Sequence, residues 1–131
     1  MIMIGTKCRL EQPVTKELTA ASIGSGALPV FGTPYMAAMM ENAAMTALQT
    51  YLADGQGSVG TRLDITHDAP TPIGMTVWAE AEIVSVSENG RMVEFNVTAW
   101  DEKGPIGGGR HTRAIIKNEK FLAKCNAKLE Q

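Results

Sequence analysis

The chain has 131 residues, of which 44% are hydrophobic and 20% charged, with a formal net charge of -2 and an isoelectric point near 5.7. This length fits one domain, residues 1–131, around a single core, and the composition is that of a folded protein rather than a disordered one. The slight acidity argues against a broad basic surface, so nucleic acid is not an expected partner.

Neither a secretory leader nor a membrane span is expected. Met1–Gly5 is too short for the apolar core of a leader. The apolar run Pro34–Leu52 is about long enough to cross a bilayer, but it lacks basic flanks and carries Glu41, so we expect a buried helix in a cytoplasmic protein with no membrane partner. Cys8 and Cys125 lie far apart without Cys-x-x-Cys spacing, which predicts neither a zinc site nor a disulfide framework.

The first part of the chain predicts a strand, a loop and one long helix. Lys7–Val14 is typical of a short edge strand, and the small residues of Ala20–Pro29 indicate a loop or lid. Thr33 can cap the helix, and Pro34 suits its first turn because the missing N–H costs nothing there. Asp54-Gly55 is expected to end it.

The helix is apolar on nearly every side. Residues that recur at helical spacing are Met36, Met40, Ala43, Ala44, Ala47 and Tyr51, while alanine and leucine occupy much of the opposite face. Such a helix is usually enclosed by other structure, and Glu41 is its only charge. Glu41 either lies on a solvated strip, the default for a glutamate, or is a buried carboxylate whose reactivity is used in chemistry.

The second part of the chain predicts β structure. The expected strands are Ser58–Asp68, Thr76–Ser87, Arg91–Trp100 and Ile106–Lys117, followed by a short helix from Asn118. Asn89-Gly90 is a strong signal for a two-residue hairpin. A sheet that curves around one helix, joined in this order, is the hotdog fold of the α+β class.

Three motifs resemble the hotdog-fold thioesterases related to fluoroacetyl-CoA thioesterase. "GTPYMAAMMENA" is similar to the start of that family's helix, "GSVGTRLDITHDAPTPIGMTV" to a strand and the turn after it, and "IGGGRHTRAIIKNEKF" to the last strand and its exit. The motifs occur in the family's order and extend from about Phe31 to Phe121.

The resemblance implies an activity and a site. It places a catalytic threonine, glutamate and histidine at Thr33, Glu41 and His67, and substrate-binding residues at Gly60 and Arg113. It also implies an acyl-CoA substrate, no cofactor, and a homodimer or larger homo-oligomer. The family's fluoroacetyl-specific member has an aromatic-rich lid, whereas Thr19–Pro29 is shorter and has no aromatic residue, which predicts a different acyl group.

Each of these residues also has a structural reading. Thr33 is by default a helix cap, and a lone histidine such as His67 is more often a hydrogen-bonded structural residue than a catalyst. His111 is a possible supporting residue. No short ligand spacing supports a metal site. The lysine stripe Lys120, Lys124 and Lys128 is either a solvated face or a contact for the phosphates of coenzyme A.

The predicted function is hydrolysis of a small or short-chain acyl-CoA thioester, in which Glu41 acts as nucleophile or as general base. The alternative is an acyl-CoA-binding module without activity on the same fold; a hotdog dehydratase is less favoured because its histidine-plus-acid helix pattern is missing. Thr33 and Glu41 are eight residues apart, about 12 Å along a helix axis. This separation predicts a composite site, with Glu41 of one protomer facing Thr33 and His67 of the other.

Overall fold

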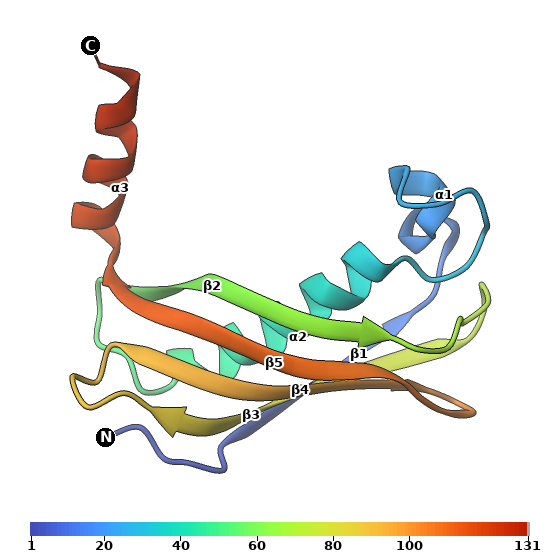
Figure 1. The fold of residues 1–131 in the computed structure, drawn as a ribbon, viewed down its shortest axis with the longest axis horizontal. Coiled ribbons are helices and arrows are strands. Elements are labelled where there is room, and N and C mark those ends of the chain that lie inside the picture. Colours follow the sequence, from blue (N-terminus) through green and yellow to red (C-terminus); the bar gives the residue numbers. More distant parts are fainter. Residues whose placement is uncertain (131) are drawn as a thin grey trace.

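The structure, a computed structural model, describes residues 1–130 and contains one antiparallel sheet with a long helix along one face (Figure 1). Its strands lie in the order β1-β3-β4-β5-β2. Their bounds are β1 Lys7–Pro13, β2 Gln56–His67, β3 Thr76–Val86, β4 Met92–Asp101 and β5 Gly104–Lys117. The predicted strands are therefore confirmed to within a few residues, and β1 and β2 are the two edges of the sheet.

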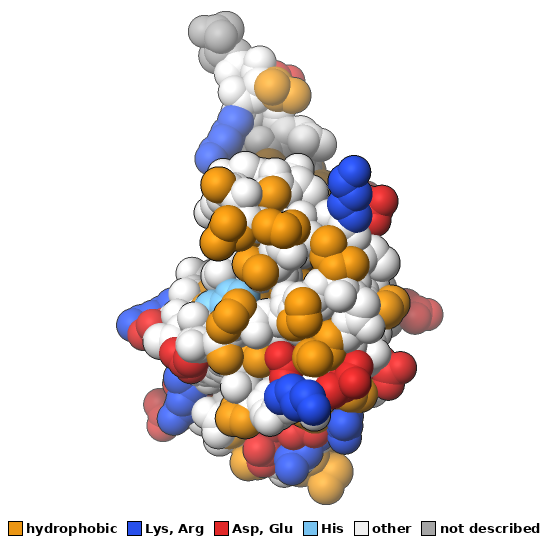
Figure 2. Space-filling view, turned by 90° about the vertical axis from the view of Figure 1, so that its right-hand side faces the viewer, with side chains coloured by type: hydrophobic (Ala, Val, Ile, Leu, Met, Phe, Trp, Pro, Cys, Tyr) orange, Lys and Arg blue, Asp and Glu red, His pale blue; other side chains and the backbone are white. Residues whose placement is uncertain are grey.

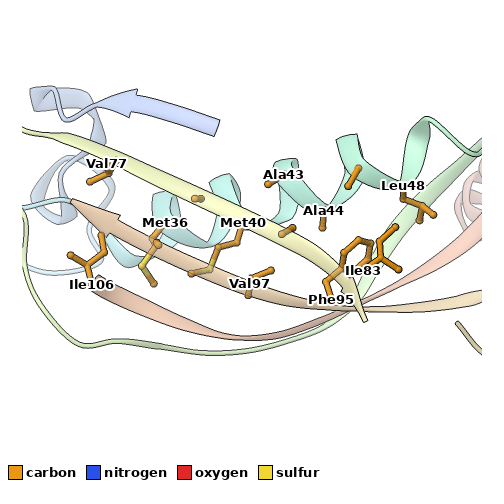
Figure 3. Close-up of a cluster of buried hydrophobic side chains, with 14 of the residues drawn as sticks. Met36, Met40, Ala43, Ala44, Leu48, Val77, Ile83, Phe95, Val97 and Ile106 are labelled. Atoms are coloured by element: carbon orange, nitrogen blue, oxygen red, sulfur yellow. The ribbon is translucent and has the colours of Figure 1, made fainter. Parts of the chain in front are cut away.

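The core lies between the sheet and helix α2, Thr33–Gln49. Alternate residues of β3 and β4 point at the helix, because successive side chains of a strand face opposite sides. On the helix, buried residues recur at three- and four-residue spacing (Figure 3). The fully buried side chains of this core include Met36, Met40, Leu48, Val77, Ile83, Phe95, Val97 and Ile106.

One face of α2 is open to solvent in the single chain, which corrects the prediction of a helix enclosed on all sides. Ala38, Asn42, Met45 and Gln49 are exposed, and Met45 retains 41% of its surface. The reason is geometric: one five-stranded sheet covers only one side of a helix. The apolar composition of the uncovered side is thus unexplained by the fold of one protomer.

The start of α2 also differs from the prediction. Gly32, not Thr33, is the N-cap, and no side chain caps the helix there. Thr33 already has helical geometry as the first residue, so its hydroxyl is not placed to accept the N–H groups of the first turn. Pro34 lies in the first turn as predicted.

Two segments extend away from the sheet at opposite ends of the molecule (Figure 1). The predicted lid contains a short helix, α1 Ala20–Ile23, in which the Ser22 N–H donates to Thr19 Oγ1 at 3.2 Å. The tail forms helix α3, Asn118–Asn126, and a final 3-10 turn, Ala127–Leu129, both fully exposed. Among residues 1–130, no helix is long and apolar enough to cross a membrane.

Two glycines are required by their surroundings, one in a predicted turn and one where two strands lie close together. Gly90 has a φ of 74° in the hairpin between β3 and β4, a conformation that favours glycine. A Cβ atom on Gly107 would collide with the carbonyl oxygen of Thr66 on the neighbouring strand β2. In the described part of the chain both cysteines are free, and no group of three potential ligands could hold a metal ion.

Candidate active site

Thr33 and His67 form a hydrogen-bonded pair at one end of the molecule. Thr33 is the first residue of α2 and His67 the last residue of β2, and Thr33 Oγ1 lies 2.7 Å from His67 Nδ1. Phe31 packs edge-on against the imidazole, with ring centroids 6.3 Å apart. The loop before α2 and the end of the edge strand therefore hold the histidine ring in place.

A cavity of about 250 Å³ lies beside this pair. Its lining comes from the lid and from the turn after β2, and it includes Ala20, Val30, Phe31, Thr33, His67 and Pro70. Figure 2, which views this end of the molecule, shows histidine atoms at the surface with hydrophobic side chains on one side of them. Ser25 and Asp68 also line it, so the cavity offers a space of mixed character next to two groups that can exchange a proton.

The environment of His67 keeps its imidazole neutral. Burial lowers the pKa of His67 below its usual value, although the negative charge of Asp68 and a backbone hydrogen bond at Ala69 oppose this shift. Its Nε2 atom is buried and has no hydrogen-bond partner among residues 1–130. A buried ring nitrogen without a partner is costly, so it is available to a bound ligand.

Glu41 lies in a second group of polar residues, on the inner face of β2 and β5. A Cβ atom on Gly60 would lie 3.2 Å from Glu41 Oε2 and 3.5 Å from Arg113 Nη1. The same Cβ atom would lie 3.0 Å from His111 Cε1. The absence of a side chain at Gly60 therefore lets Glu41, His111 and Arg113 lie close to the backbone of β2.

The hydrogen bonds around His111 define its protonation. His111 Nδ1 lies 2.7 Å from the carbonyl oxygen of Arg62, which can only accept, so this nitrogen carries the proton. Nε2 lies 3.2 Å from Arg113 Nη1, which can only donate, so Nε2 accepts. Burial is the main cause that lowers the pKa of His111, and the positive charge of Arg113 adds to it.

Arg113 is buried, with 6% of its surface exposed, and is held in place by Ser58. Its Nε donates to Ser58 Oγ at 2.8 Å, and its Nη2 donates to the Ser58 carbonyl oxygen at 2.9 Å. Burial lowers the pKa of Arg113, and the negative charge of Glu41 opposes this shift. The sequence analysis did not identify Ser58 and left the role of His111 open. Two-residue alternation along β5 could have indicated that His111 belongs to this group, because it places His111 on the same side of the sheet as Arg113.

A β-bulge places the two groups on the same face of the sheet. Gly60 and His67 are seven residues apart, an odd spacing that would point them to opposite faces of a regular strand. The register of β2 against β5 shifts between Gly60 and Arg62, which leaves Thr61 as an extra residue. Both positions therefore face the helix, but about 20 Å of strand separates them. Within one chain, Thr33 and His67 come together while Glu41 does not join them.

This fold is that of the hotdog-fold thioesterases, and comparisons with known proteins agree. A curated fluoroacetyl-CoA thioesterase of Streptantibioticus cattleyicolor is 46% identical over 99 residues, which cover 76% of this chain and 70% of that protein. The solved structure of the fluoroacetyl-CoA thioesterase FlK superimposes with a TM-score of 0.90 at 36% identity, with 98% of both chains covered. A hot-dog-like protein of Thermanaerovibrio acidaminovorans shares the fold, with a TM-score of 0.88 at 24% identity over 98% of this chain and 93% of that one.

The model of the family described as fluoroacetyl-CoA-specific thioesterase matches residues 14–119. The chain belongs to this family. The family and the hotdog fold predicted from the sequence are both confirmed.

Proposed function

We propose that this protein hydrolyses the thioester of a small or short-chain acyl-CoA, giving the free acid and coenzyme A. The observation that carries the proposal is the Glu41 carboxylate lying directly against Gly60, with His111 and the buried Arg113 around the same position. Family membership and the 46% identical thioesterase support the same reaction class. The proposed catalytic residues are Thr33, Glu41 and His67, and Gly60 and Arg113 are proposed to bind substrate.

The residues perform this reaction in one of two ways. In the first, Glu41 attacks the thioester carbon, the C–S bond breaks, and water then hydrolyses the resulting anhydride. In the second, Glu41 takes a proton from a water molecule that attacks the same carbon. In both, a proton reaches the departing sulfur through His67, and backbone N–H groups near Gly60 or the start of α2 stabilise the oxyanion. A single turnover in ¹⁸O-labelled water identifies the first route if water attacks the Glu41 carbonyl carbon of the anhydride, because the label then stays in Glu41, whereas the second route places it only in the acid product.

The acyl group proposed is not fluoroacetyl. The lid segment 19–29 has no aromatic side chain, and its residues from Ala21 to Pro29 are exposed. Since the cavity beside His67 has a volume of about 250 Å³ and a lining of mixed apolar and polar residues, it suits a small acyl group in general.

A dimer formed through β2 is proposed to complete the site. β2 is a 12-residue edge strand whose outer backbone groups have no partner in the described chain, a template for pairing with another strand. Arg62 and Asp64 are 76% and 75% exposed on this edge and flank Leu63. In an antiparallel pair centred on Leu63, Arg62 of each protomer faces Asp64 of the other, so the edge is complementary to itself.

The same register would bring the two polar groups together. With Leu63 at the centre and Thr61 left out as the extra residue of the bulge, Gly60 faces Ile65 of the second copy, and Ser58 faces His67 of the second copy. Neighbouring strands lie about 5 Å apart, so Glu41 beside Gly60 would come close to the other protomer's Thr33–His67 pair. Sedimentation tests this proposal: a 14.0 kDa species that keeps full activity at micromolar concentration would contradict it.

Thiol release from a panel of acyl-CoA thioesters of increasing chain length tests the activity. We expect the highest kcat/KM with short, unbranched acyl groups and a lower value with fluoroacetyl-CoA. If no thioester releases thiol above background, while acyl-CoA binds, the protein is a binding module.

A further inference from the structure

A second, larger pocket lies at the opposite end of the sheet from the Thr33–His67 pair. Its volume is about 720 Å³, and we call it the basic pocket. Four cationic residues line it: Arg91 from the β3–β4 hairpin, Lys117 at the end of β5, and Lys120 and Lys124 from α3. Helix α3, which stands away from the sheet in Figure 1, forms one wall.

The charges in the basic pocket are unbalanced. The chain has 12 basic and 14 acidic residues, yet the lining contains four basic residues and neither aspartate nor glutamate. The ion pair found among residues 1–130 joins Arg62 to Asp64, so the four cations have no carboxylate partner in the described chain. Converging cations without a counter-charge attract an anion with several negative groups, such as a diphosphate.

The rest of the lining suits a flat apolar group next to those phosphates. The floor includes Ile2, Leu52 and Ile115, and two aromatic residues, Tyr51 and Phe121, contribute to the wall. Phe121 is 40% exposed although it is fully apolar. An exposed aromatic ring beside cations is the surface on which a nucleotide base stacks.

The basic pocket is connected to the Glu41 group by one row of side chains. His111, Arg113, Ile115 and Lys117 alternate along β5 and therefore face the same side of the sheet. Arg113 and Lys117 are four residues apart, about 13 Å along the strand. A ligand that occupies both places must have a reactive group, a linker of this reach and a phosphorylated nucleotide end.

We propose that the basic pocket binds the nucleotide end of the acyl-CoA substrate, with its phosphates against Arg91, Lys117, Lys120 and Lys124 and its base against Phe121. This inference rests on the proposed function, from which it takes the identity of the ligand. For Lys120 and Lys124, it favours contact with the phosphates of coenzyme A over a merely solvated face. Lys128 does not line the pocket.

The test compares acyl-CoA with the matching acyl-pantetheine, which has the same thioester but lacks the nucleotide. In the double variant Lys120→Ala/Lys124→Ala, we expect KM for acyl-CoA to rise at least tenfold with kcat unchanged, and neither constant to change for acyl-pantetheine. The matched control is Lys103→Ala/Lys128→Ala, which removes two exposed lysines outside the pocket and should leave both substrates unaffected. An unchanged KM for acyl-CoA, or an equal rise for both substrates, overturns the proposal.

Calorimetry separates this proposal from the proposed activity. Adenosine 3′,5′-bisphosphate should bind the wild-type protein and the control variant, and at least tenfold more weakly the Lys120→Ala/Lys124→Ala variant. Inorganic pyrophosphate should bind more weakly than the nucleotide, because it cannot use Phe121. Equal affinity of the nucleotide for all three proteins overturns the pocket assignment. If neither thioester is hydrolysed, the activity fails, while the calorimetric result still decides what the pocket binds.

Discussion

The hydroxyl of Thr33 contacts His67 instead of capping its own helix, and this separates its chemical role from its structural one. Because Gly32 is the N-cap, removing the hydroxyl leaves the helix start intact. We therefore expect Thr33→Val to lower kcat/KM at least tenfold while the midpoint of thermal unfolding changes little. Thr33→Ser keeps the hydroxyl and should retain most activity. A Thr33→Val enzyme with the wild-type rate would show that the contact is not used in the reaction.

Glu41 is the residue on which the proposed reaction depends most. Glu41→Gln keeps the shape of the side chain but removes both the nucleophile and the base, so kcat/KM should fall by at least a hundredfold. The measurements are thiol release and the far-UV circular dichroism spectrum, which should remain that of the wild type. Glu88→Gln in the exposed hairpin removes the same charge elsewhere and should be fully active. Comparable rates for the two variants would place the reaction elsewhere.

Residue identities at the site could be predicted from the sequence, but their contacts could not. A lone carboxylate in an apolar helix and a histidine at the end of a strand are visible as local exceptions to a pattern. The Thr33–His67 contact joins positions 34 apart in the chain, and the Arg113–Ser58 contact joins positions 55 apart. Local pattern carries no information about such pairs, which is why Thr33 was predicted to be a cap.

At the scale of the strands, Gly60 leaves room that β2 and β5 need for the Glu41 group. In Gly60→Ala, the new methyl would lie 3.0 Å from His111 Cε1 and 3.2 Å from Glu41 Oε2. These contacts are tight enough to displace the carboxylate, so we expect at least a tenfold loss of kcat and an unfolding midpoint lowered by several degrees. Gly26→Ala in the lid is the control, since its Cβ would meet only an ordinary contact at 3.4 Å. Equal activity of the two variants would rule out a role for the space at Gly60.

His111 in β5 predicts a dependence of stability on pH. Burial holds the pKa of His111 below its ordinary value of 6.5 in the folded protein, so the unfolded chain takes up the proton first as the pH falls. The free energy of unfolding should therefore be constant above about pH 7 and decrease below pH 6.5, by at most about 1.4 kcal/mol per pH unit for this group. His67 shifts in the same direction and adds to the effect.

Urea unfolding at pH 5, 6, 7 and 8 measures this dependence. The decrease between pH 7 and pH 5 should be smaller in His111→Gln than in the wild type, whatever the absolute stability of the variant. His67→Gln leaves the contribution of His111 in place and serves for comparison. An acid decrease of full size in His111→Gln would exclude His111 as its source.

The elements could be predicted from local patterns far better than the irregularities between them. Alternation, the Asn89-Gly90 turn and the apolar period of α2 located every strand and the long helix. The bulge at Gly60 and Arg62 has no comparable local signal, because it depends on pairing with β5. That bulge decides which face Gly60 presents, so the site could not be assembled from strand patterns alone.

At the scale of the whole molecule, the open face of α2 and the free edge of β2 are the two features on which the proposed dimer rests. Each protomer has a Glu41 group and a Thr33–His67 pair, but about 20 Å of strand separates them. The eight-residue spacing of Thr33 and Glu41 already predicted that these two residues lie apart along the helix. The distance between Gly60 and His67 along β2 is a second, independent reason. In the proposed dimer, each site takes Glu41 from one protomer and Thr33 and His67 from the other.

Mixing two inactive variants tests the shared site. In a dimer of one Glu41→Gln chain and one His67→Ala chain, one site collects both substitutions and the other collects neither. Random exchange makes half of the dimers mixed, so activity should return to about a quarter of the wild-type value. The control mixes wild type with a chain that carries both substitutions, under the same conditions. Mixed dimers should form here too, but each of their two sites has one substituted residue, so neither site is intact. Failure to recover activity, although mixed dimers form by mass spectrometry, would mean that each protomer assembles its own site.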